Sequence, residues 1–86
     1  MLGNSIIHTK SMVRLKNISR NGKQVMMDCY EEGNQKRVHY VVFDTESLEI
    51  VNGVKNNIYI MQGIAKIWKY LRSGEELPQE TVSYWY

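Results

Sequence analysis

Polar and apolar residues alternate on both sides of a two-residue turn in the first third of the chain. In the stretch VRLKNISRNGKQVMMDCY, residues 13–16 and 24–29 each place every second side chain on one apolar face. Asn21-Gly22 stands between them, and both residues tolerate the positive φ that a two-residue hairpin turn requires. The pattern predicts an antiparallel pair of strands.

The next two segments extend this hairpin. Residues 38–43, VHYVVF, are β-branched or aromatic on both faces, which is typical of a central strand covered on two sides. A turn around Gly33-Asn34 precedes them, and the polar residues 44–47 form the next reversal before a short strand at 48–51. We therefore expect a four-stranded antiparallel meander.

A helical period follows the fourth strand. Between residues 58 and 72, apolar side chains recur at spacings of three and four on one helical face; they are Ile60, Ile64, Ile67 and Leu71. Asn56 or Asn57 can cap the start, and Gly74 follows the last turn. Gly63 inside the helix costs about 1 kcal/mol relative to Ala, which indicates a close backbone approach. The predicted fold class is α+β, an antiparallel four-stranded β-meander with one C-terminal helix packed on one face.

The chain closes with LPQETVSYWY, which has three large aromatic rings on its last three residues. Pro78 prevents the helix from resuming, and residues 81–84 alternate polar and apolar with high strand propensity. We expect a terminal extended aromatic segment laid along the sheet. Trp85 then points opposite to Val82 and Tyr84, so one side contacts the core and the other meets a partner. The candidate interaction residues of this segment are Tyr84, Trp85 and Tyr86.

One helix covers only one face of such a sheet. Met26 and Ile18 are predicted to project opposite to Val25 and Val13, and the third strand is apolar on both faces. The second face therefore needs a cover, either the terminal segment or a second copy of the chain. This favours a small, non-enzymatic protein-interaction or accessory regulatory module with an unknown protein partner, or a homodimer.

Charge suggests an alternative function. Eleven basic and nine acidic residues give a net charge of +2, too small to drive uniform nonspecific binding to DNA. No acid, however, interrupts the chain from Lys10 to Lys23. The alternative is a nucleic-acid-binding β-sheet protein that neutralises phosphates and stacks bases on a basic strand face. Its candidate residues are Arg14, Lys16, Arg20 and Lys23, with Tyr30 and Tyr40 nearby.

Side chains suited to catalysis or metal binding are few. His8, His39 and Cys29 are the only imidazole and thiol donors, and none stands at ligand spacing from another. A Cys29–His39 pair across neighbouring strands lacks an orienting group and an oxyanion site. The pairs Glu31/Glu32 and Glu75/Glu76 fall in predicted turns, where we expect them to be solvated. The sequence therefore predicts no catalytic residue, metal, cofactor or enzymatic activity.

The length of 86 residues allows one domain with a single core. Residues 1–11 show no period and precede an internal Met12, so we expect a flexible or loosely docked arm, followed by one α+β domain over residues 12–86. The longest apolar runs have four residues, far below the ~18 of a membrane span, and no secretory signal pattern is present. A single cysteine fits a reducing compartment. We therefore expect a cytoplasmic protein without membrane contact.

The order of these segments resembles a group of small uncharacterised bacterial proteins. The resemblance spans residues 12–86 and rests on the NG hairpin, a YEEG turn, a VVFD to LEIV reversal, the helix and a tail of the LPxxTVxxWY type. Its most specific residues are Leu77, Pro78, Thr81, Val82, Trp85 and Tyr86. It transfers no activity, cofactor or partner. Such proteins tend to carry Gly where Leu48 stands, so a positive φ there would strain Leu48 by about 1 kcal/mol or more.

Overall fold

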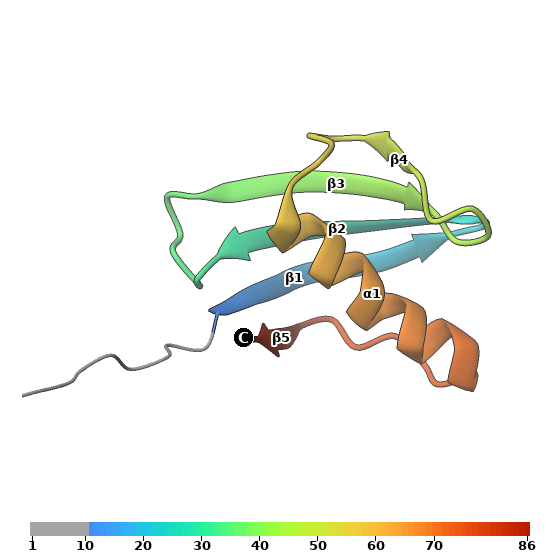
Figure 1. Cartoon of the computed structure of the whole chain (residues 1–86). Helices are drawn as coiled ribbons and strands as arrows, with labels where there is room; N and C mark the ends of the chain where they lie inside the picture. The colour runs from blue at the N-terminus through green and yellow to red at the C-terminus, as the bar shows by residue number, and fades with distance from the viewer. Residues whose placement is uncertain (1–10) are drawn as a thin grey trace, which may run out of the picture.

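A computed structural model describes residues 11–86, which form one antiparallel sheet and one helix (Figure 1). The elements in chain order are β1 (Ser11–Asn21), β2 (Gln24–Glu31), β3 (Val38–Asp44), β4 (Ile50–Asn52), α1 (Ile58–Ser73) and β5 (Thr81–Trp85). The order of strands across the sheet is β4-β3-β2-β1-β5. Within the described range, no helix is long and apolar enough to cross a membrane. The predicted α+β class is confirmed.

The sheet has five strands where the sequence predicted four. The predicted meander is present as β1 to β4, and the terminal segment forms β5 against β1, with Ser11 opposite Trp85 and Leu15 opposite Thr81. The alternation in this segment covers only five residues, which is too few to distinguish a paired strand from an extended tail. Since Ser11 belongs to β1, the predicted arm overlaps this strand by one residue, and its remainder, residues 1–10, lies outside the described residues.

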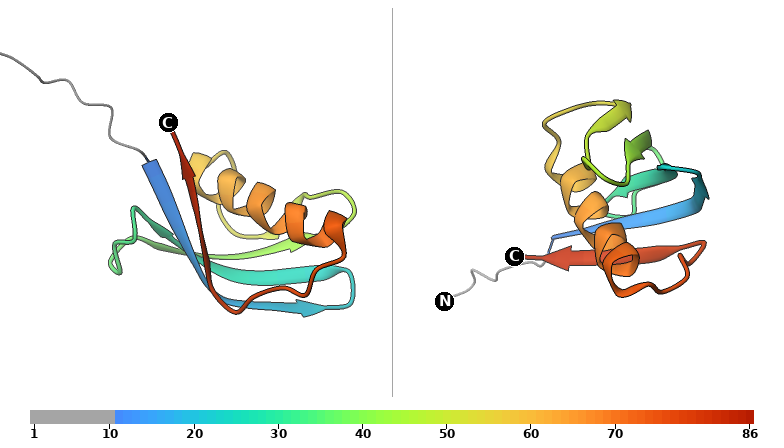
Figure 2. Two further views of the ribbon diagram at one scale, coloured as in Figure 1. Left: turned by 90° about the horizontal axis from the view of Figure 1, so that it is seen from below. Right: turned by 90° about the vertical axis from the view of Figure 1, so that its right-hand side faces the viewer.

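The helix α1 packs across one face of the sheet (Figure 2). The core lies between the two layers; its buried apolar residues are Val13, Leu15, Ile18, Val25, Met27, Cys29, Val41, Phe43, Ile60, Ile64 and Ile67. Gly63 faces the sheet, where an added Cβ would lie 2.9 Å from Leu15 Cδ2 and 3.4 Å from Met27 Cε. The predicted close approach at Gly63 is therefore confirmed.

A β-bulge in β1 changes which side chains face the helix. Asn17 has a φ of +54°, and the pairing with β2 shifts by one residue between Lys16 and Ser19. The extra residue reverses the alternation of the strand. Ile18 therefore lies in the core with 6 % exposure, and the prediction that it projects opposite to Val13 is wrong.

Both ends of α1 carry the caps that the sequence indicates. Asn57 Oδ1 accepts hydrogen bonds from the backbone N–H groups of Tyr59 and Ile60 at 2.9 and 3.1 Å. Gly74 adopts a left-handed φ of 76° and donates its N–H to the carbonyl of Leu71 at 3.3 Å. These caps satisfy backbone groups that a helix end otherwise leaves unpaired. They also fix where the helix enters and leaves the sheet surface.

Leu48 adopts a φ of +62° in the loop between β3 and β4. This conformation costs a leucine roughly 1–2 kcal/mol. Its backbone N–H donates to the carbonyl of Asp44 at 2.8 Å, and its side chain packs against the core. The packing offsets the strain, so a leucine occupies a position that a glycine would fill without strain.

Candidate interaction surface

The face of the sheet opposite α1 is covered by no other element of residues 11–86 (Figure 2). We call it the open face. Its side chains, assigned from strand register and alternation, are those of Met12, Arg14, Lys16, Met26, Asp28, Tyr30, Val38, Tyr40, Val42, Val82 and Tyr84. Tyr40 is 69 % exposed and Met26 45 % exposed. The open face is thus an exposed surface of aromatic, aliphatic and charged side chains on four adjacent strands.

The charges on the open face are balanced. Arg14 Nη1 lies 3.3 Å from Glu80 Oε2, just before β5. Lys16 is the direct cross-strand partner of Asp28, and its Nζ lies 5.4 Å from the centroid of the Tyr30 ring. Each of these two cations therefore has a carboxylate neighbour, and the face has no excess of positive charge.

The four basic residues predicted to form one strand face lie in two places. Arg14 and Lys16 precede the bulge and lie on the open face, whereas Arg20 follows the bulge and lies toward the C-terminal half of α1. Lys23 is in the β1–β2 turn, with its Nζ 3.6 Å from Glu46 Oε2. The structure does not bring the four together, because the bulge reverses the alternation between Lys16 and Arg20.

The three terminal aromatic residues also separate. Trp85 faces the core side, where its ring meets that of Tyr59 edge to face, with centroids 5.5 Å apart. Tyr84 pairs with Met12 and faces the open side, where it is 57 % exposed. Tyr86 follows the strand and is 85 % exposed. As expected for a strand, Trp85 and Tyr84 point in opposite directions, and Trp85 is the one that contacts the core.

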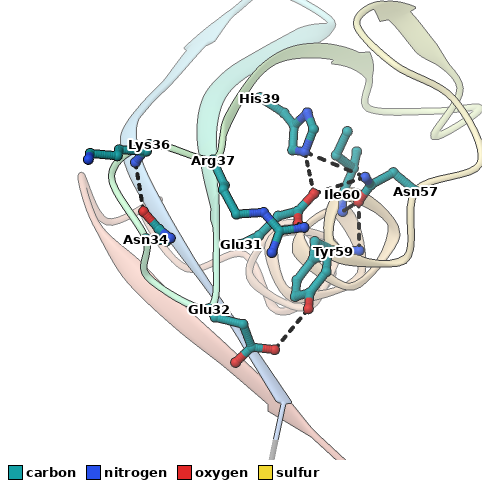
Figure 3. A network of polar contacts seen from close by, with 9 residues as sticks. All are labelled: Glu31, Glu32, Asn34, Lys36, Arg37, His39, Asn57, Tyr59 and Ile60. Atoms are coloured by element: carbon teal, nitrogen blue, oxygen red, sulfur yellow. Dashed lines mark hydrogen bonds and ion pairs between the residues drawn. The ribbon is translucent and has the colours of Figure 1, made fainter.

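A buried carboxylate lies where the sequence predicted a solvated one. Glu31 is only 6 % exposed at the end of β2. Figure 3 shows its carboxylate between three partners: Arg37 Nη2 at 2.6 Å, His39 Nε2 at 2.6 Å, and the amide of Asn57, which donates at 3.3 Å. The prediction for Glu31 is wrong because β2 continues one residue further than the turn pattern indicated. Glu31 continues the inward alternation of Val25, and extending that alternation would have found it.

This polar cluster joins the start of α1 to the sheet. Asn57 caps the helix through Oδ1 and bonds Glu31 through Nδ2, so one side chain serves both elements. Beside it, the Tyr59 hydroxyl donates to Glu32 at 2.9 Å (Figure 3). The Glu31 carboxylate thereby connects the end of β2 to His39 on β3 and to Asn57 at the start of α1. The cluster positions the helix on the sheet.

Cys29 is poorly suited to act as a nucleophile. It is the cross-strand partner of His39, as a Cys–His pair would require. Burial, with a smaller effect from the Asp28 carboxylate, raises the pKa of Cys29 to about 12. The thiolate is the reactive form, and His39 Nε2 is directed to Glu31 instead. Among residues 11–86, no group of three His, Cys, Asp or Glu side chains could hold a metal ion.

Glu31 makes the stability of the fold depend on pH. The hydrogen bond from His39 holds the pKa of Glu31 below its ordinary value of 4.5, although burial opposes this effect. The hydrogen bond from Asn57 and the positive charge of Arg37 lower the pKa further, each by less. A depressed folded-state pKa contributes stability that is present above the unfolded-state pKa and lost as pH falls through the folded-state pKa. We expect the melting temperature to decrease as the pH is lowered below about 4.5. The slope from this group is at most about 1.4 kcal/mol per pH unit.

Thermal unfolding over a series of acidic buffers measures this dependence. Glu31→Gln removes the titrating group and should flatten the slope. Asp44→Asn is the matched comparison, because it removes another carboxylate whose pKa is lowered in the folded protein. The pKa of Asp44 is lowered by hydrogen bonds from the backbone N–H groups of Ser47 and Glu46. An unchanged slope in Glu31→Gln would contradict the assignment.

Comparisons with known proteins give no relative from which a function could be transferred. No family model, curated protein or solved structure matches the chain. A functional argument therefore rests on the geometry of the described residues.

Proposed function

We propose that this protein is a small, non-enzymatic protein-interaction module that binds its partner through the open face. The observation that supports this most strongly is the exposure of Tyr40 and Met26 on adjacent strands of a sheet face that no described element covers. Burying apolar surface stabilises an association by about 25 cal/mol per Å². Tyr and Met are also enriched at the centres of protein interfaces.

A protein partner accounts for this face better than a nucleic acid does. Single-stranded nucleic acids bind to grooves with an excess of positive charge, whereas Arg14 and Lys16 each have a carboxylate beside them. A second copy of the chain is the simplest partner. A two-fold interface places the same patch on both sides, and a patch that carries both signs of charge can pair with itself.

Two exposed methionines allow a matched test. Met26 is 45 % exposed on the open face, and Met61 is 56 % exposed on α1. We expect Met26→Glu to weaken self-association, or binding of a captured partner, by about tenfold or more, because a carboxylate would be buried at the interface. Met61→Glu should leave association unchanged. Sedimentation equilibrium measures self-association. Affinity capture from native cytosol in the presence of nuclease measures binding of another partner.

The outcomes separate the two function classes. If Met26→Glu and Met61→Glu changed association to the same extent, the open face would not be the binding surface. Capture that disappears after nuclease treatment, together with a gel shift that weakens steeply with salt, would support the nucleic-acid alternative instead.

A further inference from the structure

A second surface, on the other side of the sheet, gathers three cations around a tryptophan. It is a groove of about 320 Å³ between the β1–β2 turn and the C-terminal half of α1. Its lining residues are Arg20, Lys23, Thr45, Glu46, Trp68, Leu71 and Arg72. We call it the basic groove. Its cations come from segments about 50 positions apart in the sequence, so the fold brings them together.

Both arginines of the basic groove are held in place by one contact each. The guanidinium carbon of Arg72 lies 4.4 Å from the centroid of the Trp68 ring, a contact that holds the guanidinium against the indole. Arg20 donates its Nε–H to the carbonyl of Gly22 at 3.0 Å. Neither guanidinium forms an ion pair with a carboxylate of residues 11–86. The two guanidinium groups are therefore held in position, and their terminal N–H groups can donate hydrogen bonds to an anion.

The opposite wall is also fixed. The backbone N–H of Thr45 donates to the carbonyl of Lys23 at 2.7 Å, which ties the β3–β4 loop to the β1–β2 turn. Glu46 is the one carboxylate lining the groove, and it lies 3.6 Å from the Lys23 ammonium, with both side chains largely exposed. The groove lining therefore carries three cations and one carboxylate, and Glu75 and Glu76 lie beyond it, in the neighbouring hollow that Arg20 also lines.

An interaction with the helix dipole explains only part of this arrangement. A cation in the last turn of a helix stabilises it by about 0.3–1 kcal/mol, which accounts for Arg72. It does not account for Arg20 and Lys23, which belong to the hairpin and nevertheless line the same groove as Arg72.

We propose that the basic groove binds the phosphate group of a small phosphorylated ligand. One arginine guanidinium can donate two parallel hydrogen bonds to the oxygens of a phosphate group. Two pre-positioned arginines and a lysine match the double negative charge of a phosphate better than the single charge of a carboxylate. The volume lies at the lower end of the range for small-molecule sites. The Trp68 ring lines the groove together with these charged groups. This site is separate from the open face.

Titration of the full chain with inorganic pyrophosphate, followed by NMR at constant ionic strength, tests the proposal. We expect saturable shifts of the Arg20 and Arg72 Nε–H signals and of the Trp68 indole N–H signal. The indole of Trp85, which packs on Tyr59, is the internal control and should not move. Arg72→Gln should weaken binding by about tenfold or more. Lys69→Gln, on the same helix but outside the groove lining, should change it little.

Each other outcome overturns the proposal. Shifts that do not saturate, or equal losses in Arg72→Gln and Lys69→Gln, would show a charged surface without a site. A single-stranded oligonucleotide that binds the groove more tightly than pyrophosphate would show a nucleic-acid site instead. Backbone spectra establish that each variant is folded. Met26→Glu should retain pyrophosphate binding, so failure of the open-face proposal can be distinguished from failure here.

Discussion

Deleting Tyr84 to Tyr86 is expected to lower the free energy of unfolding by about 2–4 kcal/mol. The deletion removes Trp85, whose burial against the core contributes up to about 3 kcal/mol and whose edge-to-face contact with Tyr59 adds about 0.5–1.5 kcal/mol. It also removes the pairing of Trp85 with Ser11. A domain of this size has a total stability of only about 5–15 kcal/mol. Urea unfolding should show the loss as a clearly lower midpoint.

Deleting Tyr86 alone is the matched control, because this residue follows β5 and is 85 % exposed. Its loss removes little buried surface, so it should lower the stability much less than the loss of all three residues does. A chain without Tyr84 to Tyr86 that is as stable as the parent but no longer binds a partner would show that the tail is a recognition motif. The assignment of Trp85 to the core would then be wrong.

Replacing Gly63 by valine is expected to destabilise the fold by about 1–3 kcal/mol, the usual cost of overpacking a core. Even a Cβ at this position would lie 2.9 Å from Leu15 Cδ2, and Leu15 is fully buried. Gly63→Ala has a smaller net effect, because the gain in helix propensity of about 1 kcal/mol opposes the steric cost. Thermal unfolding, with chemical denaturation as a second measure, gives both values.

Ala65→Val provides the control on the same helix. Ala65 is exposed, so valine there changes only helix propensity, by a few tenths of a kcal/mol. If Gly63→Val were no less stable than Ala65→Val, the helix would not be held against the sheet at Gly63.

Most of the fold could be predicted because its signals are local and repeated. Alternation predicted β1 and β2, and Asn21-Gly22 predicted the turn between them. Residues that are β-branched or aromatic on both faces predicted β3, and a sustained period of three and four predicted α1 between its caps. The bulge at Asn17 depends on a single residue with positive φ, and no repeated pattern marks it. The reversed position of Ile18 therefore could not be derived from alternation, which assumes an uninterrupted strand.

The candidate site was less predictable, because it depends on contacts between distant segments. The apolar third strand correctly indicated that the second sheet face is not fully polar. The terminal segment, one of the two expected covers of that face, instead pairs at the sheet edge as β5 and leaves Tyr40 69 % exposed. The partners of Glu31 come from β3 and from the start of α1, so their meeting requires the register of β2 with β3 and the position of the helix. The basic groove likewise requires the bulge, because without it Arg20 would lie on the same face as Arg14.

The position of Cys29 beneath Gly63 determines how the protein meets thiol reagents. Its sulfur lies where a side chain on Gly63 would contact it, 3.6 Å from the added Cβ, and the residue is fully buried. A reagent can therefore reach this thiol only after α1 has moved away from the sheet. The rate of alkylation then depends on how often the two layers part, as hydrogen exchange does for a buried amide. Because the chain has one cysteine, this labelling reports the separation of helix and sheet without any engineered probe.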